Sequence, residues 1–147
     1  MFNKNCNSNS IRNSRKNQEE RREFLNTPIK GRRIVKVMKV TYCEAEEDKP
    51  ERMHLFCRVI NPDGTYDPRP INTVFGCWKG VDPDKFQVLM DNLQAAASVN
   101  KPSGLKGKVF SAVLLPKERN GAWMKNQYLM SWFEAADAPE RQVEQSN

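Results

Sequence analysis

The sequence predicts a mainly β domain of five strands, with one helix between the third and the fourth strand. The helix has the clearest pattern, because apolar residues recur at the spacing of one helical face: Phe86, Leu89, Met90, Leu93 and Ala97. Asp82 suits the N-cap and Pro83 suits the first helical position, so we expect a helix over Asp82–Val99. Strand-like segments separated by turn residues lie on both sides of it, in the order β-β-β-α-β-β.

The first two expected strands are Ile34–Glu44 and Met53–Ile60. The first has apolar side chains on both faces, which is typical of a strand that bends across a small barrel. Lys36 and Lys39 fall on opposite faces of this strand, so at most one of them can join a common surface. The second strand alternates, and its expected inward residues are Met53, Leu55, Cys57 and Val59. Its other face carries a histidine, a phenylalanine and an arginine, which is unusual for a plain solvated surface.

Three further strands are expected over Ile71–Lys79, Leu105–Leu115 and Trp123–Phe133. Gly76 lies inside the first of these and indicates a bulge or a close backbone approach. Pro116 is expected to end the fourth strand, because proline cannot donate to a sheet ladder. An Asn-Gly pair before the fifth strand is a strong signal for a hairpin turn.

Five strands with one helix between the third and the fourth is the order of an OB-fold barrel. In such barrels the second and third strands, with the first and last hairpin loops, bind oligonucleotides. We therefore expect a five-stranded OB-fold barrel over residues 31–134, a basic and largely disordered arm over 1–30, and an acidic flexible tail over 135–147. Within the arm, Glu19–Leu25 suits one or two helical turns. The alternative fold is a five-stranded α+β sheet with a packed helix.

Charge is distributed unevenly along the 147 residues, whose formal net charge is +6. Residues 1–33 hold nine Lys or Arg against three acids, residues 34–133 hold fourteen against eleven, and residues 134–147 hold one against four. This gradient suits a polyanionic partner, with an acidic tail that competes for the same groove. The alternative is two solvated ends that keep the protein soluble. The same two interpretations apply to the cations of the arm, which are Arg12, Arg15, Lys16, Arg21 and Arg22.

The sequence gives no indication of catalysis. It lacks the phosphate-binding glycine-rich loop, the nucleophile elbow and the zinc-protease helix motif, and it has a single histidine. We therefore predict that it is not an enzyme and needs no cofactor. None of the four cysteines forms a C-x-x-C pair, which argues against a zinc site and fits a reducing compartment. The sequence does not decide whether a disulfide joins two of Cys43, Cys57 and Cys77. No segment has the roughly 18 apolar residues of a membrane span, so no membrane partner is expected.

The C-terminal half also shows a family resemblance. The amphipathic helix from Pro83, the Leu105-Lys106-Gly107-Lys108 strand opening, the charged hairpin, and Asn126 in a last strand ending in aromatics resemble phage-type single-stranded DNA-binding proteins of the OB class. The resemblance covers about residues 34–134. It implies a protein that coats single strands during DNA replication or recombination in the cytoplasm, a host's cytoplasm if the protein is viral. Many members end in an acidic tail with a terminal aromatic that recruits replication proteins; this tail is acidic and ends Glu144-Gln145-Ser146-Asn147.

Binding of single strands without sequence readout needs cations that follow the phosphates and aromatic faces that stack on bases. The second and third strands offer an aromatic residue with a cation beside it, namely Phe56 with Arg58 and Trp78 with Lys79. The remaining candidates lie near the fourth strand and its hairpin: Lys106, Lys108, Lys117, Arg119, Trp123 and Lys125.

Each aromatic candidate has a structural alternative. Trp123 follows Asn-Gly-Ala at a hairpin tip, where it has little core to reach, so it is the strongest stacking candidate. Phe56 could instead be core beneath the arm, and Trp78 could cap the end of the barrel. His54 is expected to line a surface without a special role. Aromatic residues inside strands usually pack, so four are expected in the core or barrel wall: Phe75, Phe110, Tyr128 and Trp132.

The expected ligand is single-stranded DNA, with RNA as the variant, because bases of both stack alike. Replication or recombination proteins are expected partners of the acidic tail, and self-association of the chain is a further alternative. A different class of function is a structural or adaptor protein of a virion or replisome, in which an OB-like face binds another protein. In that case Trp78 and Trp123 would anchor a protein interface. Phosphate binding would depend steeply on salt, whereas a protein interface would not.

Overall fold

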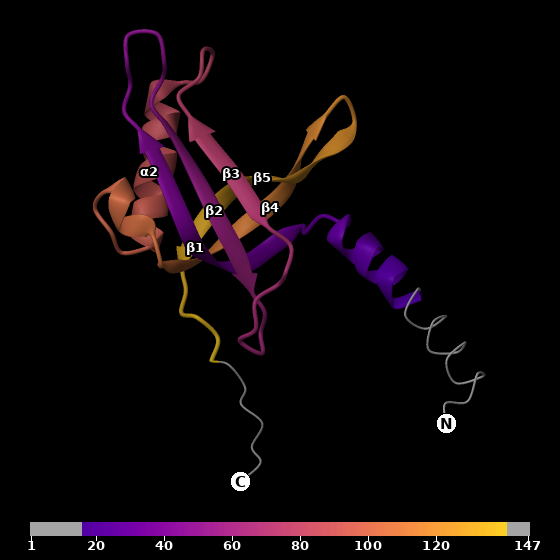
Figure 1. Cartoon of the computed structure of the whole chain (residues 1–147). Helices are drawn as coiled ribbons and strands as arrows, with labels where there is room; N and C mark the ends of the chain where they lie inside the picture. The colour runs from indigo at the N-terminus through magenta and orange to yellow at the C-terminus, as the bar shows by residue number, and fades with distance from the viewer. Residues whose placement is uncertain (1–15, 141–147) are drawn as a thin grey trace, which may run out of the picture.

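The computed structural model describes residues 16–140, and these form a mainly β domain whose five strands make one closed sheet (Figure 1). Around the barrel the strand order is β1-β2-β3-β5-β4, and β4 returns to β1. The strands are β1 (Gly31–Cys43), β2 (Arg52–Ile60), β3 (Ile71–Gly76), β4 (Val109–Arg119) and β5 (Ala122–Ala135). The expected β-rich fold, with its helix between the third and fourth strands, is confirmed.

Several expectations concern residues outside the described range. They are the disorder of the first fifteen residues, the position of Arg12 and Arg15, and the end of the acidic tail over 141–147. Within the described range, residues 16–25 are helical, which includes the segment expected to form one or two helical turns. No helix between residues 16 and 140 combines the length and the apolar content needed to cross a membrane.

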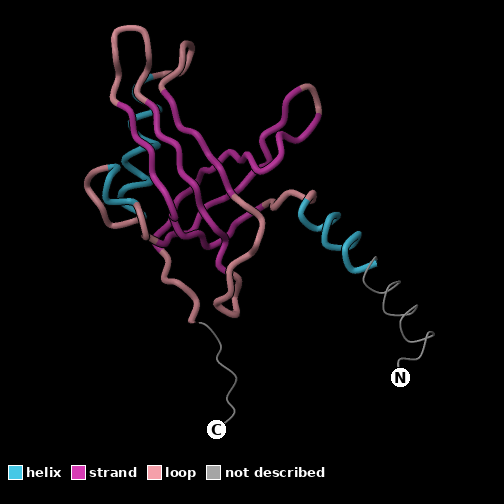
Figure 2. The backbone as a smooth tube through the Cα atoms, in the orientation of Figure 1, coloured by secondary structure: helices cyan, strands magenta, loops and turns pink. Residues whose placement is uncertain are grey.

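The barrel has one weakly paired seam. β1 is long enough to pair with β4 through Gly31–Lys36 and with β2 through Ile34–Cys43. In contrast, β3 and β5 run parallel and are paired in register only at Asn72 and Gln127. Beyond this point β4 and β5 continue together as a hairpin that projects from the barrel (Figure 2). The seam between β3 and β5 therefore leaves backbone and side chains that no neighbouring strand covers.

A bulge in β1 explains why its sequence is apolar on both faces. Val35 and Val37 are fully buried, the pairing register with β2 shifts after Val37, and Met38 is exposed. After the shift, Val40 and Tyr42 pack against the same core. The strand therefore points odd-numbered residues toward the core before the bulge and even-numbered residues toward it after the bulge. The expected inward face of β2 is confirmed, since its four alternating apolar residues are all buried.

The start and end of β4 differ from the expectation. Leu105 lies in a 3-10 turn, η1 (Pro102–Leu105), and Gly107 has a φ of 83°, so the strand begins only at Val109. Pro116 does not end the strand. The register with β5 shifts between Pro116 and Glu118, because four β5 residues, 124–127, oppose Lys117 alone, and β4 continues past its proline to Arg119. β3 is shorter than expected and ends at Gly76.

A second bulge, in β5, overturns the expectation that Trp132 is core. Tyr128 and Met130 are buried, but the register with β4 shifts between Ser131 and Glu134. Trp132 has a φ of 53° and is 76% exposed, and Phe133 takes the position against the core instead. The expectation holds for the other three aromatics, Phe75, Phe110 and Tyr128.

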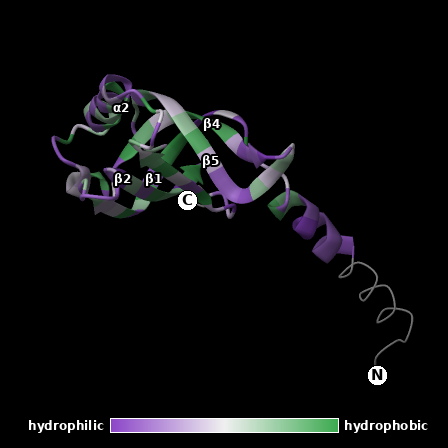
Figure 3. Ribbon diagram, turned by 90° about the horizontal axis from the view of Figure 1, so that it is seen from above, coloured by the Kyte–Doolittle hydropathy of each residue, from purple (hydrophilic) through white to green (hydrophobic). Residues whose placement is uncertain are grey.

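The helix α2 (Pro83–Ala96) packs against the barrel with the predicted apolar stripe. The backbone N–H of Asp84 donates to the Asp82 carboxylate at 2.9 Å, which confirms the N-cap. Phe86, Met90 and Leu93 are buried and join the strand residues in a single core. Apolar residues alternate with hydrophilic ones along α2 and the strands (Figure 3).

The helix ends three residues before the predicted Val99. Ser98 has a φ of 57°, which is outside the right-handed helical region. Its N–H donates to the Ala95 carbonyl at 3.1 Å, and the N–H of Val99 donates to the Gln94 carbonyl at 2.9 Å. This pair of bonds is a Schellman cap, here built on a serine rather than the usual glycine. The sequence therefore offered no glycine to indicate the end of the helix.

Candidate nucleic-acid interface

The outer surface of β1 and β2 gathers cations that the sequence pattern separated. Lys36 is paired with Arg58, and Lys39 is paired with Phe56, so all four residues lie on the outside of the barrel. The expectation that the two lysines lie on opposite faces is wrong, because the bulge at Met38 shifts the alternation by one residue.

Phe56 and Arg58 form a cation–π pair on this surface. The guanidinium carbon of Arg58 lies 5.2 Å from the centre of the Phe56 ring, and its Nη1 donates to the carbonyl of Pro68. Phe56 is half-buried and is not among the residues of the barrel core, so the alternative that it is a core residue is not supported. Tyr66 extends the surface, because its hydroxyl lies 3.4 Å from Nζ of Lys36 and its ring is exposed. The surface offers aromatic faces next to positive charge.

A cavity of about 360 Å³ lies at the seam between β3 and β5. The Asn72 amide nitrogen donates to the Asn126 carbonyl at 3.3 Å and thereby crosses the seam. This bond leaves Asn72 Oδ1 facing His54, whose Nε2–H donates to it at 3.1 Å. The cavity also receives two lysines from the β4–β5 hairpin, Lys117 and Lys125. The hairpin end of β5 is correspondingly hydrophilic (Figure 3).

A second cavity, of about 420 Å³, continues the first along β3 toward the start of α2. The two share Val74, Lys117 and Leu129, so they form one groove, which we call the seam groove. Lys117 lies at the middle of the seam groove, where the register between β4 and β5 shifts and leaves it without a partner residue in β5. Lys85 lines the far end. Among the described residues that line the seam groove there is no Asp or Glu, so its charge is entirely positive.

Trp78 lines the α2 end of the seam groove. Its indole lies against Gly76, where an added Cβ would overlap the ring, and the residue is 44% exposed. Gly76 therefore allows the close approach that the sequence indicated, and the group that approaches its backbone is the Trp78 side chain. Trp78 itself lies in the turn after β3, closed by a hydrogen bond from the Val81 N–H to its carbonyl at 2.9 Å. The indole therefore lies close to the Gly76 backbone and is also partly exposed to solvent.

Trp123 does not lie free at the hairpin tip. Its indole N–H donates to the Gln127 carbonyl at 3.2 Å, and its ring meets the edge of Tyr128 at 5.9 Å between centres. It packs against the core, so the expectation that it has little core to reach is wrong. The reason is the register shift of the β4–β5 hairpin: residues 124–127 of β5 oppose Lys117 alone, and the Trp123 ring lies back against Gln127 and Tyr128. Whether its partly exposed ring also binds bases stays a prediction.

The structure brings only some of the sequence candidates together. Lys117, Lys125 and Trp78 line the seam groove, and Lys79 is exposed next to Trp78 in the chain. Arg119 is exposed at the end of the hairpin, where it is paired with Ala122.

Lys106 and Lys108 belong to a different part of the barrel. The Lys108 carbonyl accepts a hydrogen bond from the Val37 N–H at 2.9 Å, so this segment lies against β1. Lys106 lines a separate cavity with Val40 and Tyr42. In the wall of this separate cavity, a hydrogen bond to Glu51 and burial raise the pKa of Tyr42 to about 12.

Sequence reasoning missed several residues of the seam groove: His54, Asn72, Lys85 and Gln127. His54 carried a signal, because it lies on the unusual outer face of β2. Asn72 and Gln127 carried none, because they meet only through the parallel pairing of β3 with β5. This pairing joins segments more than fifty residues apart.

The described residues contain no obvious reactive centre. No group of three His, Cys, Asp or Glu between residues 16 and 140 is placed to hold a metal ion. Cys43, Cys57 and Cys77 are free thiols, so the disulfide that the sequence left open does not form among them. Burial raises the pKa of Cys57 to about 12, which keeps this thiol protonated and unreactive.

No protein-family model matches the sequence, and no curated protein matches it. The interpretation of the chain therefore depends on its own geometry.

Proposed function

We propose that the chain is an OB-fold protein that binds single-stranded nucleic acid, with single-stranded DNA as the ligand, and that it does so without strong sequence preference. The barrel order β1-β2-β3-β5-β4, with α2 between β3 and β4, supports the OB assignment. The observation that carries the proposal is the seam groove, which has lysines along its length, no carboxylate among the described residues of its walls and an exposed indole at one end.

The groove supplies the two interactions that a single strand needs. Lys85, Lys117 and Lys125 lie along one path and can each neutralise a phosphate. Trp78 offers a face for base stacking, and the paired Phe56 and Arg58 offer another on β2. These contacts do not depend on base identity, because every base has a stacking face. The chain would therefore act by coating exposed strands in replication or recombination, without catalysis.

The test is a fluorescence-anisotropy titration with labelled oligo-dT at low and moderate salt, beside a duplex of equal length. We expect micromolar or tighter binding to the single strand, weaker binding to the duplex and a steep loss with salt. Trp78→Ala should weaken binding about ten-fold, the effect of one stacked base. The double variant Lys117→Ala/Lys125→Ala should lower both the affinity and the salt dependence.

A matched control removes two lysines elsewhere. Lys49→Ala/Lys101→Ala changes exposed residues of the β1–β2 loop and of the segment before η1. Although the first hairpin loop binds oligonucleotides in the OB pattern, neither segment contributes a described residue to the seam groove, so this variant should leave binding nearly unchanged. Equal binding of single strand and duplex would reduce the groove to a general basic patch. No binding at low salt would contradict the proposal.

One observation favours the second candidate, a structural or adaptor protein. Trp132 is 76% exposed, and its carbonyl accepts a hydrogen bond from Arg32 at 3.1 Å on the outer side of β5. Tryptophan with arginine is a common pair at protein interfaces. If this is the function, Trp132→Ala should abolish capture of a replisome or virion protein and leave oligonucleotide binding unchanged. Such binding should also be insensitive to salt.

A further inference from the structure

Another cavity, which we call the helix cavity, lies where the N-terminal helix meets the β4–β5 hairpin. Its volume is about 260 Å³, and Lys125 of β5 forms one wall. The opposite wall is one helical face, because its residues are spaced at i, i+3, i+4 and i+7: Gln18, Arg21, Arg22 and Leu25. Three glutamates, at positions 19, 20 and 23, belong to the same helix but are not among the residues that line the cavity. Two guanidinium groups and one ammonium group therefore line the cavity, and none of its described lining residues is a carboxylate.

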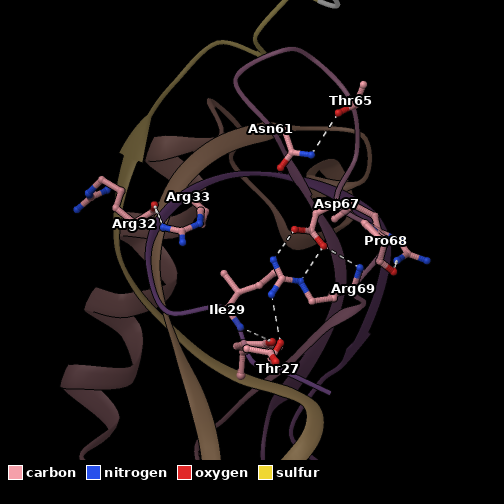
Figure 4. A network of polar contacts seen from close by, with 11 residues as sticks. Thr27, Ile29, Arg32, Arg33, Asn61, Thr65, Asp67, Pro68 and Arg69 are labelled. Carbon is pink, nitrogen blue, oxygen red and sulfur yellow. Dashed lines mark hydrogen bonds and ion pairs between the residues drawn. The ribbon is translucent and has the colours of Figure 1, made fainter. Parts of the chain in front are cut away.

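The base of this helix is held against the barrel. The guanidinium of Arg69, in the β2–β3 loop, lies 4.2 Å from the centre of the Phe24 ring. It also donates to the Thr27 carbonyl at 3.2 Å (Figure 4). Arg69 is itself held by the carboxylate of Asp67 at 2.7 Å. Two residues after Thr27, the N–H of Ile29 donates to the buried Tyr128 hydroxyl at 2.9 Å. The position of the helix face relative to β5 is therefore defined by contacts to the core.

Lys125 connects this cavity to the seam groove. It lines both the helix cavity and the Asn72 end of the seam groove, and Lys117 then continues toward Trp78. The helix cavity therefore adjoins the first part of the seam groove through Lys125, and that part adjoins the second through Lys117. From one end to the other, the cations are Arg21, Arg22, Lys125, Lys117 and Lys85.

On the basis of the proposed function, we infer that the helix face of Gln18, Arg21 and Arg22 is an additional subsite for the sugar–phosphate backbone. It takes the part of a single strand that extends past the barrel. Guanidinium groups suit this role, because each can donate two parallel hydrogen bonds to one phosphate. The subsite adds affinity only for strands long enough to reach beyond Lys125.

Oligonucleotide length tests this inference. Labelled oligo-dT of about 5 and of about 15 nucleotides, within the range of single OB-fold sites, is titrated against the full chain. In Arg21→Ala/Arg22→Ala we expect affinity for the long oligonucleotide to fall about ten-fold, and affinity for the short one to change less than about two-fold. The salt slope for the long oligonucleotide should fall by about 1.4, the value for two lost phosphate contacts on a single strand.

Two further variants separate the subsite from other effects. Lys49→Ala/Lys101→Ala removes the same charge outside the path and should change neither affinity. Phe24→Ala removes the ring that lies on Arg69 without changing the charge, and should weaken only the long oligonucleotide, because the helix is no longer held beside Lys125. Thermal unfolding of each variant checks that the barrel is intact.

The outcomes distinguish the two proposals. If wild type binds both oligonucleotides and Arg21→Ala/Arg22→Ala affects them equally or not at all, the subsite is wrong and the seam groove is retained. If the Lys49→Ala/Lys101→Ala control loses as much, only overall charge matters and the subsite is wrong. If wild type binds neither oligonucleotide, the proposed function fails, and the subsite fails with it.

Discussion

The guanidinium of Arg69 lies 2.7 Å from the carboxylate of Asp67, and both side chains are largely shielded from solvent. The backbone N–H and Nε of Arg69 also donate to the same carboxylate, at 2.9 and 3.0 Å. Because Arg69 also contacts Thr27 and Phe24, this single ion pair links the β2–β3 loop to the base of the N-terminal helix.

Asp67→Asn should destabilise the domain by about 3 kcal/mol, because it leaves the charge of Arg69 half-buried and unpaired. The free energy of unfolding is measured by urea denaturation at neutral pH. Glu47→Gln, which changes an exposed carboxylate of the β1–β2 loop, should cost less than about 0.5 kcal/mol. A loss for Asp67→Asn as small as that of the control would show that the pair contributes little.

The contribution of Asp67 should depend on pH. Burial raises the pKa of Asp67, but hydrogen bonds from Arg69 and the charge of Arg69 outweigh this, so the net pKa lies below its usual value. The stabilisation is therefore fully present above the unfolded pKa of about 3.9 and is lost as pH falls through the lower folded value. The difference in unfolding free energy between wild type and Asp67→Asn should be constant near neutrality and shrink below about pH 4. A difference that grows on acidification would reverse the assignment.

Gly76→Ala should displace the indole of Trp78, because the new Cβ would overlap the ring. We expect a change in tryptophan emission and a loss of oligo-dT affinity close to that of Trp78→Ala. In the Trp78→Ala background, Gly76→Ala should cause no further loss of affinity, because the clash no longer exists. If Gly76→Ala instead binds as wild type does and its emission is unchanged, the indole has another place in the groove and does not stack there.

Cys57 should resist alkylation in the folded protein. Its side chain is fully buried, and burial raises its pKa to about 12, so little thiolate forms at pH values where iodoacetamide is used. Peptide mapping by mass spectrometry should show labelling of half-buried Cys43 and Cys77 at least about a hundred-fold faster than of Cys57. In denaturant the three rates should converge. Rapid native labelling of Cys57 would show that the barrel opens readily.

Removal of residues 136–147 tests whether the acidic tail competes for the seam groove. These residues carry three carboxylates and one arginine. If they occupy the groove, their deletion should tighten oligo-dT binding several-fold at low salt and less at moderate salt, because salt screens the competition. Neutralising the three carboxylates by amides in the full chain should have the same effect. Unchanged affinity in both variants would exclude the competition.

Local patterns were sufficient for much of this fold. The stripe from Phe86 to Leu93 identified α2, and the Asp82 cap and Pro83 identified its start, because helix periodicity and capping involve residues within a few positions of each other. The inward face of β2 followed from strict alternation. The order of the elements followed from turn residues. From this order the outer face of β2 and the last hairpin could be selected as candidate binding elements.

The faces of β1 and β5 could not be predicted along their whole length, because one bulge in β1 and two in β5 interrupt the alternation. A bulge exists only relative to the register of a partner strand, so it leaves no mark in the alternation of a single segment. The bulge at Met38 places Lys36 and Lys39 on one surface, and the extra residues at 124–127 of β5 bring Lys125 and Asn126 into the seam groove. The second bulge of β5 exposes Trp132, while the neighbouring Phe133 packs inward.

The sequence by itself determined the element order, the helix and its stripe, the inward face of β2, and the excess of cations over the arm and hairpin. Only the tertiary structure decided that Asn72 meets Gln127, that Lys125 stands between the seam groove and Arg22, and that Trp123 packs inward. The physical reason is the range of the interactions. Capping and periodicity act within a few residues, whereas the groove is formed by strands that pair only after the chain has closed into a barrel.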